Sequence, residues 1–266
     1  MTLTNENYFS SEKNLEYMSV SQLKSFMKCE AATMAELHGE WSRSKSTALL
    51  VGSYVDAWFE GTLDEFKAEN PEIFKRDGTL KADYVQAEEI IKRVQTDEVF
   101  MEYMSGEKQT VFTADLFGIK WKIKIDSLLP DKIVDLKVMR SMERIMGKSF
   151  VEHWGYDLQM AIYAAVYKKA TGKDLPTYLA VVTKQSPSDL ELIDIPEWRR
   201  EEILEDVQKH LPRIIDVKKG IVEPIRCGVC EYCRATKKIT VPIDFELVGL
   251  STFERETLFG GLGYDK

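Results

Sequence analysis

Ile125-Asp126-Ser127-Leu128-Leu129-Pro130-Asp131-Lys132-Ile133-Val134-Asp135-Leu136-Lys137 is a stretch that predicts a β-hairpin. Residues 120–126 alternate between polar and apolar side chains, which is typical of a half-buried strand, and residues 132–139 form the return strand. Pro130-Asp131 between them suits a two-residue turn, because proline presets the backbone of one turn position and aspartate is common in tight reversals. We therefore expect Leu129 to pair with Lys132.

This register places two carboxylates face to face. Counting outward from the turn sets Asp126 opposite Asp135, where Cβ atoms lie roughly 4.5–5.5 Å apart and like charges are destabilising. A divalent cation resolves the conflict, since Mg²⁺ is commonly held by one or two carboxylates and keeps waters for substrate phosphates. Lys137 projects from the same face, where an ammonium can orient a water or stabilise phosphate charge. The pattern indicates metal-assisted phosphodiester hydrolysis; the plain alternative is a set of solvated side chains.

An aspartate on one strand, an acidic residue two positions before a lysine on the next, and a following helix resemble the PD-(D/E)XK nuclease superfamily. Gly52-Ser53-Tyr54-Val55-Asp56-Ala57-Trp58-Phe59-Glu60 resembles the helix that precedes the catalytic hairpin in RecB-like nucleases, with Asp56 where many members have histidine. Asp157-Leu158-Gln159-Met160-Ala161-Ile162-Tyr163 resembles the glutamine-xxx-tyrosine motif that follows the catalytic lysine, and Gln159 and Tyr163 share one helix face.

The resemblance is closest to phage and prophage RecE-like exonucleases of the exodeoxyribonuclease VIII type, and it extends over residues 19–240. It implies an α/β fold in which a central mixed β-sheet with a catalytic antiparallel hairpin is flanked by helices, as in restriction endonucleases. It also implies a Mg²⁺- or Mn²⁺-dependent enzyme that digests linear duplex DNA from its ends, 5′ to 3′, in phage-type recombination. A single-strand annealing protein as partner and a homo-oligomeric ring are further expectations of this resemblance.

The expected site follows from the motifs and the resemblance together. Asp126, Asp135 and Lys137 are the expected catalytic residues, and the metal ligands are expected to be Asp56, Asp126, Asp135 and the Leu136 carbonyl. Gln159, Tyr163 and Lys124 are expected to contact DNA. Two other functions stay open, namely an endonuclease of the same superfamily and a non-catalytic DNA-binding module with the same fold.

Composition and charge limit the class of protein. With 266 residues, of which 44% are hydrophobic, the chain can bury a substantial core. A net charge of −8 argues against coating nucleic acid by bulk electrostatics, although Lys120, Lys122 and Lys124 share the strand face of Asp126 and are either solvated or follow a phosphate backbone. No run reaches the ~18 apolar residues of a membrane span, and the polar start is unlike a signal peptide, so we expect no membrane contact and a cytoplasmic protein.

We expect one nuclease domain over residues 1–240, with a helical part at 15–105, a catalytic core at 106–220 and a cysteine cluster at 227–233; residues 241–266 form a tail. Helices are expected at 19–37, 47–61, 81–104, 152–171 and 197–218, and further strands at 107–115, 177–183 and 190–195, with one sheet between the helices.

Four cysteines suggest a second metal site. Cys227, Cys230 and Cys233 are spaced by two residues, and Cys29 lies far upstream. Clustered cysteines in a cytosolic protein point to metal or redox chemistry, and four thiolates are what a [4Fe–4S] cluster or a structural zinc site requires. Some RecB-like relatives bind such a cluster through one amino-terminal and three carboxy-terminal cysteines. The close spacing favours a cluster over zinc, and four free thiols remain the alternative.

Overall fold

The computed structural model describes residues 2–42, 47–239, 242–252 and 254, with the side chains of 47–49 excepted. Packing divides the chain into two compact units. The first unit comprises Met1–Tyr8 and Ser44–Val207, and the second comprises Phe9–Arg43 and Gln208–Lys266. Among the described residues, no helix combines the length and the apolar composition needed to cross a membrane.

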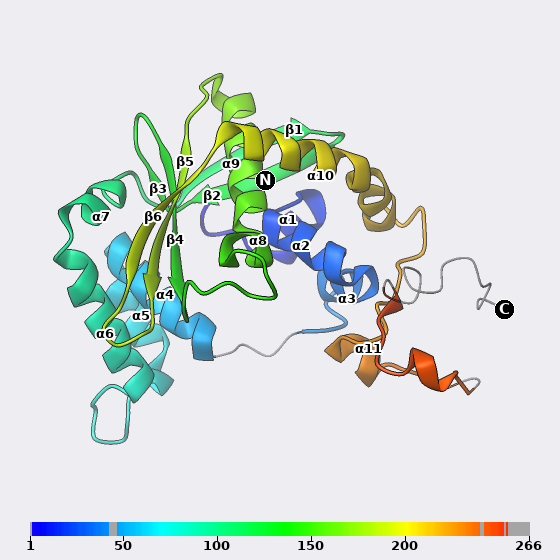
Figure 1. The fold of residues 1–266 in the computed structure, drawn as a ribbon, viewed down its shortest axis with the longest axis horizontal. Coiled ribbons are helices and arrows are strands. Elements are labelled where there is room, and N and C mark those ends of the chain that lie inside the picture. Colours follow the sequence, from blue (N-terminus) through cyan, green and yellow to red (C-terminus); the bar gives the residue numbers. More distant parts are fainter. Residues whose placement is uncertain (1, 43–46, 240–241, 253, 255–266) are drawn as a thin grey trace. The chain divides into compact units, whose positions relative to one another are not determined.

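A mixed four-stranded sheet forms the centre of the first unit (Figure 1). Its strands follow the order β3 (Ser127–Leu128), β4 (Ile133–Met139), β5 (Thr177–Thr183) and β6 (Leu190–Ile195). β4 and β5 run parallel, whereas the other two pairs are antiparallel. This arrangement confirms the expected α/β fold with a central mixed sheet.

Two strands lie outside that sheet, so the expectation of a single sheet is wrong in this detail. β1 (Thr110–Leu116) and β2 (Ile119–Ile125) form a separate antiparallel ribbon. Phe117 and Gly118 make its turn with φ values of 55° and 82°, which is the positive-φ geometry of tight hairpins. β2 therefore pairs with β1 along its whole length. Only the short β3, which follows β2, pairs with β4 on this side of the sheet.

The hairpin between β3 and β4 has the predicted register. Ser127 pairs with Val134 and Leu128 with Ile133, and the Leu129 amide donates to the Lys132 carbonyl at 3.0 Å across the Pro130-Asp131 turn. The same register extended by one step sets Asp126 opposite Asp135.

Helices cover both faces of this sheet (Figure 1). One face packs against α4 (Thr47–Glu60), α5 (Leu63–Glu69), α6 (Ala82–Gln95) and α7 (Glu98–Tyr103), and the 3₁₀ turn Pro71–Ile73 joins this layer. Val134 and Leu136 of β4 enter the apolar core there. Because side chains alternate along a strand, Asp135 and Lys137 point to the opposite face, toward α9 (Tyr156–Thr171), which follows the short helix α8 (Phe150–Trp154).

Two expected helices are each divided by a local signal. The helix expected at 81–104 is α6 followed by α7, and Asp97 caps α7 by accepting the Phe100 amide at 2.9 Å. The helix expected at 152–171 is α8 followed by α9, with Gly155 between them at φ 61°. The capping side chain of Asp97 explains the first interruption, and the positive φ of Gly155 explains the second.

The second unit is mainly helical. It contains α1 (Ser11–Glu16), α2 (Val20–Lys28), α3 (Glu30–Leu37), the later part of α10 (Glu197–Lys218), α11 (Glu231–Ala235) and the 3₁₀ turn Phe245–Leu247. Ser19 caps α2, because its hydroxyl accepts the Gln22 amide at 3.3 Å. The continuous helix expected at 19–37 is wrong, since Cys29 is extended, with φ −165° and ψ 106°, and separates α2 from α3.

Candidate active site

Asp126 is fixed beside β4 at the point where β3 begins. β3 is two residues long, so it does not cover the edge of β4 at Leu136. There the Leu136 amide donates to Asp126 Oδ2 at 3.0 Å, and Gln109 Nε2 donates to Asp126 Oδ1 at 3.2 Å. The carboxylate thus takes the place that a neighbouring strand would occupy, and both of its oxygens are held.

Asp135 and Lys137 form a buried ion pair on the opposite face of β4 from the apolar core. The Asp135 side chain is 2% exposed, and its Oδ2 contacts the Lys137 ammonium. Gln159 Nε2 on α9 donates to Asp135 Oδ1 at 2.7 Å. The Lys137 ammonium also donates to the Leu136 carbonyl at 3.3 Å and lies 4.9 Å from the centroid of the Tyr156 ring. The lysine is therefore held on the side where the two aspartates meet.

The carboxylates in this region repel one another in a poorly solvated setting. Burial raises the pKa of Asp126 well above its usual range, and the charges of Asp135 and Asp56 raise it further. Burial likewise raises the pKa of Asp56 on α4 to about 7; Lys137 opposes this shift, while Glu60 and Asp135 add to it. Asp56, Asp126 and Asp135 come from two different parts of the chain, and they lie close enough for their charges to interact.

Lys137 supplies the opposing charge. Burial acts to lower the pKa of Lys137, but the charges of Asp135 and Asp126 outweigh burial and raise the pKa above its usual range. The side chain stays an ammonium at neutral pH. Lys124 on β2 belongs to the same charge set, because it lowers the pKa of Asp56.

Gln159 and Tyr163 lie one turn apart on α9, as the motif predicts. Tyr163 is 8% exposed, and burial together with the Asp135 charge raises its pKa well above the usual range. Gln159 donates to Asp135, and its hydrogen bond with the Tyr163 side chain acts to lower the pKa of Tyr163. The structure therefore directs Gln159 at a carboxylate of the site, while its predicted contact with DNA stays a prediction.

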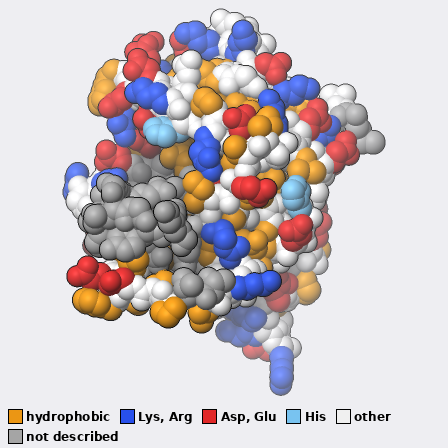
Figure 2. All heavy atoms as spheres, turned by 90° about the vertical axis from the view of Figure 1, so that its right-hand side faces the viewer, with side chains coloured by type: hydrophobic (Ala, Val, Ile, Leu, Met, Phe, Trp, Pro, Cys, Tyr) orange, Lys and Arg blue, Asp and Glu red, His pale blue; other side chains and the backbone are white. Residues whose placement is uncertain are grey.

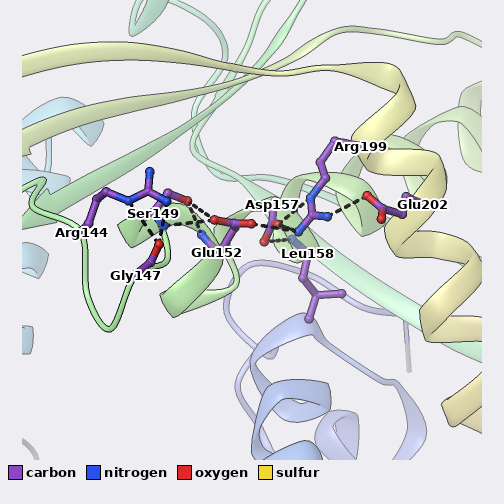
Figure 3. Close-up of polar contacts among 8 residues, drawn as sticks. All are labelled: Arg144, Gly147, Ser149, Glu152, Asp157, Leu158, Arg199 and Glu202. Atoms are coloured by element: carbon purple, nitrogen blue, oxygen red, sulfur yellow. Dashed lines mark hydrogen bonds and ion pairs between the residues drawn. The ribbon is translucent and has the colours of Figure 1, made fainter.

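A polar network fixes the start of α9 (Figure 3). The Asp157 carboxylate is buried and accepts from Arg199 at two points, from Nε at 3.1 Å and from a terminal nitrogen at 2.7 Å. Arg199 also pairs with Glu202 at 2.7 Å and lies 3.8 Å from Glu152. Ser149 and Glu152 form a capping box at α8. The network links both helices to α10 and so sets the position from which Gln159 reaches β4.

Lys122 departs from the expectation that Lys120, Lys122 and Lys124 are either solvated or follow a phosphate backbone. Its side chain is 1% exposed, its ammonium donates to the Tyr8 carbonyl, and it lies 4.6 Å from the centroid of the Tyr8 ring. Tyr8 in turn donates to the Lys122 carbonyl at 3.3 Å. A phosphate cannot use this ammonium, whereas Lys120 is exposed and Lys124 is partly exposed.

Sequence reasoning missed Tyr8, Gln109, Asp157 and Arg199. Tyr8 and Gln109 reach the site through tertiary contacts and carry no motif that would identify them. Asp157 has one weak local signal, since it is an acidic residue in the first turn of a helix.

The four cysteines converge in the second unit. Cys29 Sγ lies 3.7 Å from Cys233 Sγ, Cys227 Sγ lies 3.9 Å from Cys233 Sγ, and all four sulfurs lie within 4.8 Å of one another. Burial acts against a thiolate at Cys227, but backbone amides that donate to its sulfur lower its pKa to about 7. The predicted grouping of these cysteines is therefore present, and it brings together residues 198 positions apart.

The mixed sheet, its hairpin and the acidic site with one lysine define a domain of the PD-(D/E)XK nuclease superfamily. The chain belongs to the family described as a PDDEXK-like domain of unknown function, whose sequence model matches residues 19–236.

A solved structure supports the same assignment. The chain is similar to a protein from Eubacterium rectale described as a "Putative exonuclease", with 49% sequence identity and a TM-score of 0.89. The similarity covers 94% of this chain and 99% of that one. A search among curated proteins gave no match.

Proposed function

We propose that this protein is a Mg²⁺- or Mn²⁺-dependent exonuclease that hydrolyses phosphodiester bonds of linear duplex DNA. The observation that carries the proposal is the meeting of Asp126, Asp135 and Lys137 at the open edge of β4, where a carboxylate pair and an ammonium face one place. The exonuclease name of the similar Eubacterium rectale protein supports the exonucleolytic reading, and so does the resemblance to RecE-like enzymes.

The residues present suit a hard divalent cation. Asp56, Asp126 and Asp135 offer carboxylate oxygens and Leu136 offers a carbonyl oxygen, which are the donor types that Mg²⁺ and Mn²⁺ prefer. Asp135 Oδ2 is buried and pairs with the Lys137 ammonium, so this oxygen already carries its charge toward the proposed ion. When bound, such an ion polarises a phosphoryl oxygen and makes a coordinated water more acidic.

The surrounding residues would prepare this site. Gln159 fixes the orientation of Asp135, and Gln109 together with the Leu136 amide fixes Asp126. Lys137 would hold or orient the attacking water and stabilise the negative charge that develops on the phosphate. Lys124 on β2 is partly exposed and lowers the pKa of Asp56, and we assign it to the DNA backbone.

Charge favours local recognition of DNA rather than a broad basic surface. The net charge is −8, and Figure 2 shows basic and acidic side chains interspersed on the face that it draws. Phosphate binding then depends on a few lysines and the bound cation. By the RecE-like resemblance, we place the enzyme in phage-type recombination, acting on DNA ends together with a single-strand annealing protein and as a ring.

The test compares two forms of the same DNA. Purified protein with Mg²⁺ or Mn²⁺ should degrade linear duplex DNA and spare covalently closed circles. Lys137→Ala should lose hydrolysis by a factor of about 10² or more while it still binds DNA, since a positioned proton-handling group typically contributes that much. Lys173→Ala, which removes an exposed lysine from the loop after α9, is the matched control and should retain activity. Cleavage of closed circles would identify an endonuclease, and intact linear DNA would identify a binding module.

A further inference from the structure

We propose that Cys29, Cys227, Cys230 and Cys233 together bind one Zn²⁺ ion in a tetrahedral site that fastens the segment between α2 and α3 to the segment around α11. Both segments belong to the second unit. The proposal concerns a site separate from the acidic one and does not depend on nuclease activity.

The distances between the sulfurs carry this proposal. In a tetrahedral thiolate site each Zn–S bond is about 2.3 Å, so the sulfurs lie about 3.8 Å apart. The separations of 3.7 Å for Cys29 and Cys233 and 3.9 Å for Cys227 and Cys233 agree with one such ion, and the remaining sulfurs lie within 4.8 Å.

The same distances argue against the iron–sulfur cluster that the spacing alone favours. In a [4Fe–4S] cluster each cysteine binds a different iron at a corner of the cluster, so the sulfurs stand farther apart than on one shared ion. The four sulfurs described in this structure enclose space for an ion but are too close together to surround a cluster.

Backbone amides donate to three of the four sulfurs. The Cys230 amide donates to Cys227 Sγ at 3.3 Å, the Cys233 amide donates to Cys230 Sγ at 3.4 Å, and the Cys227 amide donates to Cys29 Sγ at 3.4 Å. Three residues separate donor and acceptor within the close-spaced run, so the chain wraps around the sulfurs and turns them inward. This wrapping removes the steric objection to three ligands so close in sequence.

Burial and the surroundings indicate a structural role. Cys29, Cys227 and Cys233 are 2–3% exposed and pack with Ala31 and Ala32, and all four expected ligand positions are protein sulfurs, as in closed structural sites. Adjacent contacts hold the same two segments together. The Ala31 amide donates to the Ile225 carbonyl at 3.1 Å, and the Ile225 amide donates to Glu30 Oε2 at 2.7 Å.

Arg213 on α10 extends this arrangement. It donates from two nitrogens to the two oxygens of Glu30, at 2.8 and 2.9 Å. Glu30 follows Cys29 directly, so the break between α2 and α3 is fixed on one side by the carboxylate and on the other by the sulfur. The extended backbone of Cys29 then follows from its role, because a continuous helix would not direct this sulfur to the carboxy-terminal run.

Metal analysis of the full-length protein, purified without oxygen and without added metal, tests the proposal. We expect about one zinc per chain and no iron, acid-labile sulfide or visible absorption. Exchange with Co²⁺ should give the intense visible bands of tetrahedral cobalt bound to thiolates. Iron with sulfide, or a chain that takes up neither Zn²⁺ nor Co²⁺, would overturn the proposal.

Two variants assign the ligands. Cys230→Ser removes the most accessible of the four sulfurs, and it should lose the ion or bind it at least tenfold more weakly, with a lower temperature of unfolding. Ala32→Ser is the matched control, because it adds a hydroxyl inside the same cluster without removing a sulfur, and it should retain a full complement of zinc. If Cys230→Ser and Ala32→Ser both fold and contain equal amounts of zinc, the assignment of Cys230 as a ligand is contradicted.

Discussion

Gln159 Nε2 lies 2.7 Å from Asp135 Oδ1, and this hydrogen bond joins a helix to the strand that carries the acidic site. The bond fixes one oxygen of Asp135 and leaves the other, Oδ2, facing Lys137. Groups that orient a metal-binding carboxylate commonly affect metal affinity almost as strongly as the ligands themselves. Gln159 is therefore a positioning residue in this structure.

Gln159→Leu should weaken Mn²⁺ binding about 10- to 100-fold, because Asp135 loses the donor that orients it. Isothermal titration with Mn²⁺ measures this, and a DNA-binding assay in EDTA measures the second function expected of the residue. Gln208→Leu, at an exposed position of α10, is the control and should bind Mn²⁺ like the wild type. A variant that binds Mn²⁺ normally but loses DNA affinity would show that Gln159 serves DNA directly.

Asp56→Asn should stabilise the metal-free protein at mildly alkaline pH and reduce its response to Mn²⁺. The substitution removes one of three mutually repelling carboxylates and, with it, a proposed ligand. A ligand present at a hundred times its dissociation constant stabilises the folded state by about 2.7 kcal/mol, so the wild type should show a clear rise in unfolding temperature with Mn²⁺.

Thermal unfolding in EDTA and in Mn²⁺ gives both quantities for Asp56→Asn. Asp64→Asn, which changes an exposed carboxylate on α5, should match the wild type in both conditions. If Asp56→Asn responds to Mn²⁺ as strongly as the wild type does, Asp56 does not bind the ion.

Gly106→Ala should destabilise the protein by about 1–3 kcal/mol, because an added Cβ would have no room. It would lie 2.6 Å from the carbonyl carbon and oxygen of Leu128 and 2.8 Å from Ser127 Oγ, so β3 would have to move. Chemical unfolding measures the loss. Gly52→Ala is the control of opposite sign: it meets nothing within 4 Å inside helix α4 and should gain roughly 0.5–1 kcal/mol. Equal effects at the two glycines would contradict the close packing at Gly106.

Arg199→Met should destabilise the first unit by about 1–3 kcal/mol, because it leaves the buried Asp157 carboxylate without its charged donor. Combining it with Asp157→Asn should recover part of the loss, and the double-mutant cycle in urea unfolding measures the coupling. Glu202→Gln, which removes an exposed partner of the same arginine, should change stability by less than about 0.5 kcal/mol. Strictly additive losses would indicate that Arg199 and Asp157 do not interact in solution.

The hairpin between β3 and β4 could be predicted from sequence because its signals are local. The Pro130-Asp131 turn fixes which residues pair, and the two-residue period of a strand then fixes the faces of Asp126, Asp135 and Lys137. Trp121 follows the same alternation and is fully buried. The roles of these residues in catalysis stay predictions.

Features that depend on distant residues could not be predicted. Lys122 follows the polar alternation of β2 yet is buried. Tyr8, 114 residues earlier, covers it, and the Tyr8 carbonyl accepts a hydrogen bond from its ammonium. Cys29 interrupts a helical pattern, because a tertiary sulfur site outweighs local propensity. The network around Arg199 joins residues 42 positions apart and has no local signature.

Gln109 has φ 54°, a left-handed backbone that costs a residue with a side chain roughly 1–2 kcal/mol. That conformation presents its amide to Asp126, whose other oxygen is already held by the backbone of β4. The side-chain entropy of this carboxylate is thus lost when the chain folds and not when a cation binds. Loading of an ion at this edge should accordingly be limited by loss of its own hydration water, and little rearrangement of the protein would accompany it.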